Sequence, residues 1–301
     1  MALLQVQVLG KLRLRHDETT IDRFPTRRVE ELLAFLLLHR EREHTREQLI
    51  DLLWTGHPPT NGRASLSTAL WRLGGVFRGL GVSPENILSS SRDWISLTPA
   101  QHLLVDATEF ETYLNEADNE SEPDRRFDHL RKAVGVYKGV FCEGIYAEWC
   151  LIERERLERR YLWALGVLMA DLIQKRAYEE AISFGKDIVE QDPLREEVHR
   201  ALMLCFWKAG DSARGIRQFQ LCARLVQEEL GILPLPETID LYRRIVDDRV
   251  NATFERPPRS DHFKQLKAAY DNFQSAAADL ESLLTADEDS SNPPDDSHKP
   301  S

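Results

Sequence analysis

The stretch N-G-R-A-S-L-S-T-A-L-W-R-L-G-G-V-F-R-G-L-G, residues 61–81, places apolar side chains three or four positions apart. This spacing predicts a helix with one apolar face. The residues of that face are Leu66, Leu70, Leu73 and Phe77. The opposite face carries arginine, serine, threonine and tryptophan side chains, and the whole stretch lacks an acidic residue.

The residues before this helix predict where it begins. Pro58-Pro59 favours a turn, and Thr60 and Asn61 are residue types that cap helices, so we expect the helix to start after them. A basic, hydroxyl-rich helix fits the major groove of DNA. The alternative is an ordinary solvated surface helix, and the neighbouring elements decide between the two interpretations.

The composition is that of a globular protein of 301 residues, long enough for two domains. The net charge of −11 argues against a protein that coats nucleic acid over its whole surface. The charge is uneven, because residues 1–106 carry 13 Lys/Arg against 12 Asp/Glu and the remainder carries 26 against 38. A contact with DNA is therefore expected to be local and near the N-terminal end.

Cysteine usage indicates a reducing compartment, and the distribution of apolar residues bears on membrane insertion and secretion. The four cysteines, Cys142, Cys150, Cys205 and Cys222, lack metal-binding spacing and are expected to be free core thiols. No signal-peptide pattern begins the sequence, and the longest apolar run, Leu32–Leu38, is too short to span a membrane. We therefore expect a cytoplasmic protein with no membrane partner.

Short β-strands are predicted on both sides of the first helices. Leu3–Leu9 and Lys11–Arg15 alternate apolar and polar residues, which is typical of a small antiparallel unit, and Ile21–Phe24 can add a strand. After residue 81, the stretch I-L-S-S-S-R-D-W-I-S-L contains two short β-like runs joined by S-S-R-D. This second pattern predicts a β-hairpin with Arg92 and Asp93 near its tip.

Two further helices are predicted before residue 61. One runs from an N-capping Thr26 to about His39, and the other opens with a capping box of Thr45 and Gln48. Strands, three helices and a hairpin in this order predict a winged helix-turn-helix. In that fold the second helix braces the DNA backbone and the third enters the major groove. The hairpin, or wing, can reach the adjacent phosphates or the minor groove.

This arrangement predicts which side chains contact DNA. Those expected on the third helix are Arg63, Ser67, Thr68, Trp71 and Arg72. Arginine can bind guanine with two hydrogen bonds, while serine and threonine can contact bases or phosphates. Trp71 packs either on DNA or on the second domain. Arg46 on the second helix and Arg92 in the hairpin are expected phosphate contacts.

The second part of the chain, residues 107–255, shows helical spacing in five segments separated by glycine or proline. These are Phe127–Tyr137, Leu151–Lys175, Tyr178–Glu190, Leu194–Lys208 and Ala213–Leu230. Ala181-Ile182 and Gly215-Ile216 lie 34 residues apart, which is the tetratricopeptide period. Such a stack binds other proteins on its concave face; alternatively, it is a packed helical domain that merely supports the first.

Six stretches resemble one family of regulators. They are V-D-A-T-E-F-E (105–111), A-V-G-V-Y-K-G-V-F-C-E-G (133–144), E-W-C-L-I-E-R-E-R-L (148–157), Y-E-E-A-I (178–182), D-P-L-R-E-E-V-H-R-A-L-M (192–203) and E-E-L-G-I-L-P-L-P-E-T-I-D-L-Y (228–242). With the winged helix before them, they resemble the Streptomyces antibiotic regulatory protein family of transcriptional activators, whose second part is a bacterial transcriptional activator domain.

The resemblance implies a fold that is mostly α with a small β component. A winged helix at 1–106 is followed by an all-α, tetratricopeptide-like domain at 107–255. It also implies that protomers bind direct repeats near a promoter and help RNA polymerase to start transcription. One departure is Gly74-Gly75, which stand where the family often has basic residues, so binding by a single protomer is expected to be weak.

Beyond residue 255 the resemblance ends. Residues 256–285 contain an apolar seam with alternating spacings of three and four: Phe263, Leu266, Tyr270, Phe273, Ala277, Leu280 and Leu284. This segment either forms a homodimer through Phe263–Leu284 or lies as one amphipathic helix on the helical domain. The acidic, Pro/Ser-rich residues 286–301 are expected to be disordered.

Motifs for catalysis and cofactor binding are absent from the sequence. It lacks a phosphate-binding glycine loop, a G-x-S-x-G elbow and an H-E-x-x-H zinc motif, so we expect no enzyme, no cofactor and no metal. His39 and His44 are interpreted as surface residues. The rival function is a protein-interaction module that uses the helical repeats, with weak or lost DNA binding.

Overall fold

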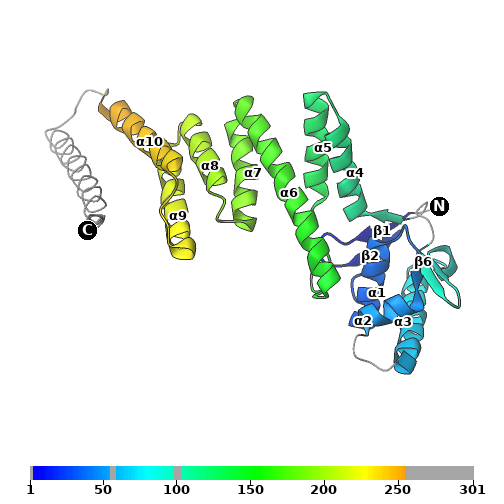
Figure 1. Ribbon diagram of the computed structural model, residues 1–301. Helices are drawn as coiled ribbons and strands as arrows, with labels where there is room; N and C mark the ends of the chain where they lie inside the picture. The colour runs from blue at the N-terminus through cyan, green and yellow to red at the C-terminus, as the bar shows by residue number, and fades with distance from the viewer. Residues whose placement is uncertain (1–2, 55–58, 98–102, 255–301) are drawn as a thin grey trace, which may run out of the picture. The chain divides into compact units, whose positions relative to one another are not determined.

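The protein is described here by a computed structural model that covers residues 3–54, 59–97 and 103–254. It is mostly α-helical with a small β component, which confirms the predicted fold class (Figure 1). Contacts divide the chain into two compact units, Met1–Tyr242 and Arg243–Ser301. The expected coiled-coil segment Phe263–Leu284 and the acidic tail lie outside the described residues.

A four-stranded sheet begins the first unit. Its order is β3-β2-β1-β7, with β1 Leu4–Gln7, β2 Arg13–His16, β3 Thr19–Ile21 and β7 Leu103–Val105. β1 and β2 are antiparallel, as predicted. The third strand lies earlier than the predicted Ile21–Phe24, because His16 pairs with Thr19 across a two-residue turn in which Asp17 has φ of 50°. The sequence did not predict β7, which is parallel to β1.

Three helices follow the first strands. They are α1 Arg27–Leu38, α2 Arg46–Leu53 and α3 Pro59–Gly79. Thr26 caps α1, and Thr45 with Gln48 forms the predicted capping box of α2. The predicted start of α3 was wrong, because the helix already includes Pro59 and Thr60. Proline suits the first position of a helix, since its missing N–H has no partner there in any helix.

A second sheet contains the predicted hairpin. Its order is β4-β6-β5, with β4 His44–Thr45, β5 Leu88–Ser90 and β6 Trp94–Leu97. A short 3₁₀ turn, η1 Pro84–Asn86, leads from α3 into β5. We call residues 88–97 the wing. The sequence did not predict β4, which pairs with β6 and joins the wing to the start of α2.

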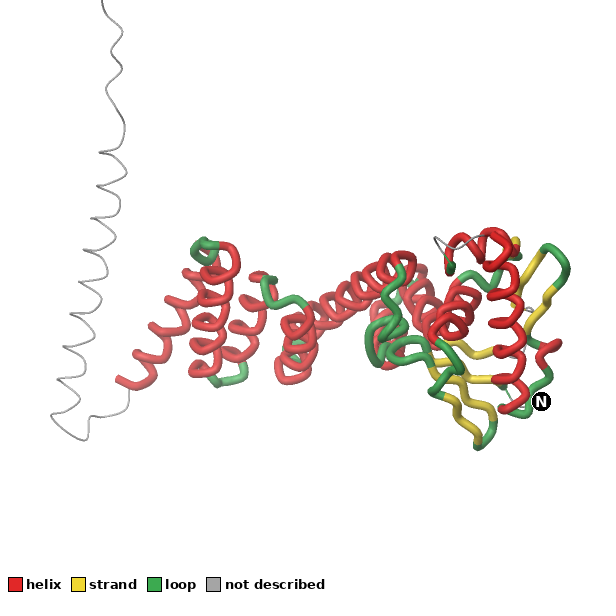
Figure 2. Tube along the Cα trace, turned by 90° about the horizontal axis from the view of Figure 1, so that it is seen from below, coloured by secondary structure: helices red, strands yellow, loops and turns green. Residues whose placement is uncertain are grey.

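The rest of the first unit is a row of helices, in which successive helices between residues 106 and 230 pack on one another (Figures 1 and 2). They are α4 Asp106–Asn119, α5 Pro123–Val136, α6 Glu148–Gln174, α7 Tyr178–Gln191, α8 Glu196–Lys208, α9 Ser212–Leu230 and α10 Pro236–Phe254, which continues into the second unit. The five predicted helices match α5 to α9 within a few residues. Gly185 permits close packing of α6, α7 and α8, because a Cβ there would lie 2.7 Å from Leu202 and 2.8 Å from Met169.

One hydrophobic core extends from the first sheet into α4, α5 and α6. The loop before α6 adds to this junction: the N–H of Cys142 donates to the carbonyl of Val8 at 2.7 Å. Arg154 donates to the carbonyls of Phe141, Cys142 and Ile145 at 3.0 Å each. The winged helix therefore packs continuously with the first helices of the row.

Two expectations about single residue types have different outcomes. All four cysteines are free and buried, as predicted. His44 was expected at the surface, but it is buried, and its ring lies 5.1 Å from that of Phe35. The tertiary contact with α1 overrides the polarity of the histidine side chain.

Candidate nucleic-acid interface

The exposed face of α3 gathers the five side chains predicted to contact DNA. Arg63, Ser67, Thr68, Trp71 and Arg72 are all exposed. The apolar residues Leu66, Leu70, Leu73 and Phe77 are all buried on the opposite face. Trp71 is 71% exposed, so most of its ring is open to solvent. The helical period alone brings this polar and aromatic set together.

The N-terminal half of α3 is close to α2. The Arg63 guanidinium lies 3.3 Å from the Glu47 carboxylate, and both side chains are more than 70% exposed. Such a pair contributes little in water, so Arg63 can exchange Glu47 for another acceptor. The Thr68 hydroxyl donates to the carbonyl of Ala64 at 2.9 Å, which leaves its oxygen lone pairs free to accept.

The C-terminal half of α3 lacks long side chains at two successive positions. Gly74 lies against Pro84, and a Cβ there would be 3.7 Å from the proline ring, an ordinary contact. Gly75 is exposed, with nothing within 4 Å of a built Cβ. Neither glycine is required by the backbone. Their effect is to interrupt the polar face between Arg72 and Arg78.

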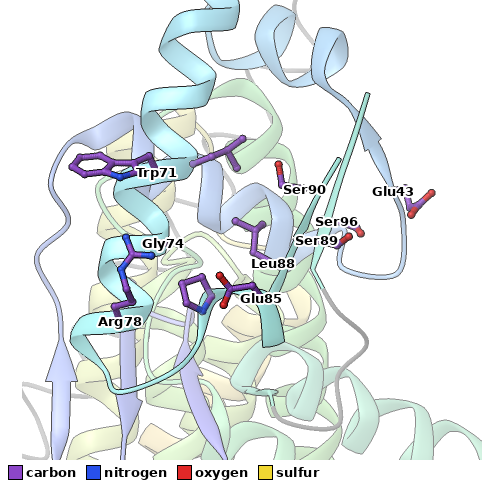
Figure 3. A pocket seen from close by; sticks show the side chains of 11 residues that line it. Glu43, Trp71, Gly74, Arg78, Glu85, Leu88, Ser89, Ser90 and Ser96 are labelled. Carbon is purple, nitrogen blue, oxygen red and sulfur yellow. The ribbon is translucent and has the colours of Figure 1, made fainter. Parts of the chain in front are cut away.

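An open groove separates α3 from the wing (Figure 3). Its volume is about 740 Å³, and its lining residues are Glu43, Leu70, Trp71, Gly74, Arg78, Pro84, Glu85, Leu88, Ser89, Ser90 and Ser96. The serine hydroxyls can donate to phosphate oxygens. The Glu85 carboxylate opposes this, since a hydrogen bond from the Ser83 hydroxyl lowers its pKa and keeps it charged. Of the residues that line the groove, the sequence predicted Trp71 as a DNA contact but not the wing serines, although the S-S-S run in the hairpin was visible.

The last two predicted residues, Arg92 in the wing and Arg46 at the start of α2, lie in different environments. Arg92 is exposed at the tip. Arg46 is half-buried, and its guanidinium donates to the Ser91 carbonyl at 3.1 Å and to the Ser90 hydroxyl at 3.0 Å. Arg92 is thus available to a ligand, whereas Arg46 already has partners in the wing.

Other kinds of site find no support in the part of the chain that the structure covers. No group of three or more His, Cys, Asp or Glu side chains there is arranged to hold a metal ion. Among the described helices, none combines the length and the apolar character that a bilayer crossing requires.

Comparisons with known proteins identify the second part of the chain and its relatives. The profile of the bacterial transcriptional activator domain matches residues 105–246. Regulatory protein AfsR of Streptomyces coelicolor is 28% identical over 298 residues, which cover 94% of this chain and 29% of AfsR. Transcriptional regulatory protein MoaR1 of Mycobacterium bovis is 24% identical over 262 residues, covering 81% of this chain and 79% of MoaR1.

The chain contains a bacterial transcriptional activator domain and is similar to regulators of the Streptomyces antibiotic regulatory protein family. Members of this family are transcriptional regulators rather than enzymes. The chain spans less than a third of the length of AfsR from Streptomyces coelicolor or Streptomyces griseus, at 29% and 25%.

A solved structure shows the fold expected for the Streptomyces antibiotic regulatory protein family. Mycobacterium tuberculosis EmbR, in complex with a low affinity phosphopeptide, matches with a TM-score of 0.65 and 19% identity. The match covers 92% of this chain and 72% of the EmbR chain. A likeness at this identity concerns the fold alone.

Proposed function

We propose that the chain is a sequence-specific, double-stranded DNA-binding regulator in the cytoplasm. In this proposal residues 1–106 bind DNA and residues 107–255 contact other proteins. α3 enters the major groove with Arg63, Ser67, Thr68, Trp71 and Arg72, and the wing reaches the neighbouring backbone with Arg92. Protomers bind direct repeats near a promoter and assist RNA polymerase, as the family implies.

One observation carries the proposal most directly. The exposed face of α3 has arginines and hydroxyls but no carboxylate, although the chain as a whole has a net charge of −11. Residues 1–106 carry nearly equal numbers of basic and acidic residues, so an ordinary solvated helix of this part would carry both signs of charge. A face free of acids, in the third helix of a winged helix, has the chemistry of a phosphate- and base-contacting surface.

The decisive experiment is selection of DNA from a random pool with the full chain, followed by titration of the selected site at several salt concentrations. A repeated site whose affinity falls steeply with salt supports the proposal. Arg72→Ala is expected to weaken binding by about tenfold or more, as for the loss of a base-contacting arginine. Arg63→Ala is expected to weaken it as well.

Arg125→Ala on α5 is the matched control, because Arg125 is equally exposed but lies away from α3. It is expected to bind like the wild type. Failure to enrich any DNA, or affinity that is indifferent to both α3 substitutions, would overturn the proposal.

A second candidate function is a protein-interaction module. The loop between α9 and α10 exposes large apolar side chains within six residues: Leu230, Ile232, Leu233 and Leu235, each more than 50% exposed. Large exposed apolar side chains grouped in this way are typical of surfaces that bind another protein. Retained binding of a protein partner by a chain that selects no DNA would favour this function.

A further inference from the structure

Arg46, the first residue of α2, makes three hydrogen bonds to the tip of the wing. Its backbone N–H donates to the carbonyl of Asp93 at 3.0 Å. Its Nε donates to the carbonyl of Ser91 at 3.1 Å, and its Nη2 donates to the hydroxyl of Ser90 at 3.0 Å. All three acceptors belong to the wing, so one residue of α2 spans the turn from Ser90 to Asp93.

The wing turn is also closed from within. The Ser91 N–H donates to the carbonyl of Trp94 at 2.9 Å, and the Trp94 N–H donates to the Ser91 hydroxyl at 3.0 Å. Thr45, the residue before Arg46, pairs with Trp94 where β4 meets β6. The wing is therefore attached to α2 through its strand and through its turn, and Arg92 projects from a turn held at both ends.

We infer that Arg46 is a positioning residue, which fixes the wing on α2 and thereby fixes the place of Arg92 at the tip. This differs from the phosphate contact that the sequence predicts for Arg46. The inference rests on the proposed function, because a fixed wing serves DNA binding only if the wing meets DNA. Its structural half, the attachment of the wing by Arg46, does not depend on DNA.

The chemistry of arginine suits this role. The guanidinium presents its N–H groups in a rigid planar fork, so Nε and Nη2 can bind Ser91 and Ser90 at the same time. A lysine at this position keeps the charge but has one flexible ammonium group and cannot reproduce the fork. Charge and geometry are therefore separable by substitution at Arg46.

The neighbouring residue supports the same division of tasks. Glu47 pairs with Arg63 on α3, while Arg46 binds the wing. Successive residues in the first turn of α2 thus contact the two elements that are proposed to meet DNA. α2 sets the position of the wing relative to α3, instead of merely lying beside the DNA backbone.

The test on DNA uses the full chain, the selected site, and the variants Arg46→Ala, Arg46→Lys, Arg92→Ala and Arg46→Ala with Arg92→Ala. A positioning role predicts that both Arg46 variants lose about fivefold or more in affinity, and that Arg92→Ala costs far less when Arg46 is already alanine. Because Arg92 then loses its phosphate contact, the salt slope falls by about 0.9 in both Arg46 variants. A phosphate contact made by Arg46 itself predicts instead that Arg46→Lys keeps the wild-type affinity and salt slope, and that the alanine effects add; these results would overturn the inference.

Amide hydrogen exchange without DNA tests the attachment by itself. Residues 88–97 are expected to exchange faster in Arg46→Ala and Arg46→Lys, while α1 and α6 keep their wild-type protection and show that the variants are folded. Unchanged exchange in the wing would sink the inference even if the wild type binds DNA. If the wild type binds no DNA but the wing loosens in both variants, the proposed function fails, and Arg46 is left as a purely structural link with no DNA role.

Discussion

α3 and the wing are proposed to meet the same DNA, but they are held in place in different ways. α3 is a 21-residue helix whose leucines and Phe77 are inserted in the core of the winged helix. The wing is two short strands whose turn is fixed by hydrogen bonds between Ser91 and Trp94 and by hydrogen bonds from Arg46 of α2. Core packing therefore places the proposed base-reading side chains, whereas a few polar contacts place the proposed phosphate-contacting tip. Loss of a single hydrogen bond should therefore increase local opening in the wing but not in α3.

Removing the core anchor of α3 is expected to have the largest effect. Phe77 is 1% exposed, and Phe77→Ala should lower the free energy of unfolding by about 3–5 kcal/mol, because it leaves a cavity as well as losing apolar burial. Chemical denaturation measures this loss. Trp71→Ala on the exposed face is the control and should change stability by less than about 0.5 kcal/mol. Equal losses in the two variants would contradict the assignment of the two faces.

Filling the glycine gap on α3 should strengthen both the helix and the proposed interface. Gly75→Arg is expected to raise the free energy of unfolding by about 0.5–1 kcal/mol, because glycine is a poor helix former and the position is open. It should also steepen the salt dependence of DNA binding by about 0.9, the value for one phosphate contact. Gly166→Arg, at an open position within α6, should give the stability gain without the change in slope. An unchanged slope in Gly75→Arg would place DNA elsewhere.

Opening the wing turn tests the other half of the comparison. Ser91→Ala removes the hydroxyl that accepts from the Trp94 N–H, and should cost about 1 kcal/mol, mainly as local opening. Hydrogen exchange should quicken in residues 88–97 and stay unchanged in α3. Equal acceleration in α3 would show that the two elements are one cooperative unit and would refute the distinction drawn above.

Releasing Arg63 is expected to have the smallest effect. Glu47→Gln removes an exposed partner at 3.3 Å and should change stability by less than about 1 kcal/mol. DNA affinity should rise, by up to about fivefold, because a repulsive carboxylate is lost and Arg63 is freed. Glu122→Gln, which releases Arg125 on α5 in the same way, should leave the affinity unchanged. Weaker binding by Glu47→Gln would mean that the ion pair orients Arg63 for DNA.

Sequence patterns predicted the parts of the fold that depend on interactions between residues close together in the chain. The 3.6-residue period gave the buried and exposed faces of α3, because side-chain burial on a long helix follows from sequence spacing alone. Capping residues located the start of α1 and α2, since their hydrogen bonds reach only three residues along the chain. The same holds for the candidate site on α3, whose five residues share one helical face.

Tertiary structure decided what lies beyond the reach of such patterns. β4 and β7 are two and three residues long and are strands only because β6 and β1 pair with them. α4 was not predicted either, and its first residue, Asp106, accepts hydrogen bonds from the N–H groups of Val8 and Leu9 nearly a hundred residues away. His44 is buried because α1 packs against it.

The same division applies to the seven predicted site residues. The sequence by itself determined which side chains of α3 face outward, because one helix carries them all. Only the tertiary structure decided the surroundings of Arg46, whose acceptors Ser90 and Ser91 lie 44 and 45 residues further along the chain. From residue type and position, the sequence predicts a phosphate contact for Arg46. In the structure its guanidinium donates hydrogen bonds to the wing. Sequence patterns could not predict these contacts, because partners so distant in sequence meet only in the folded chain.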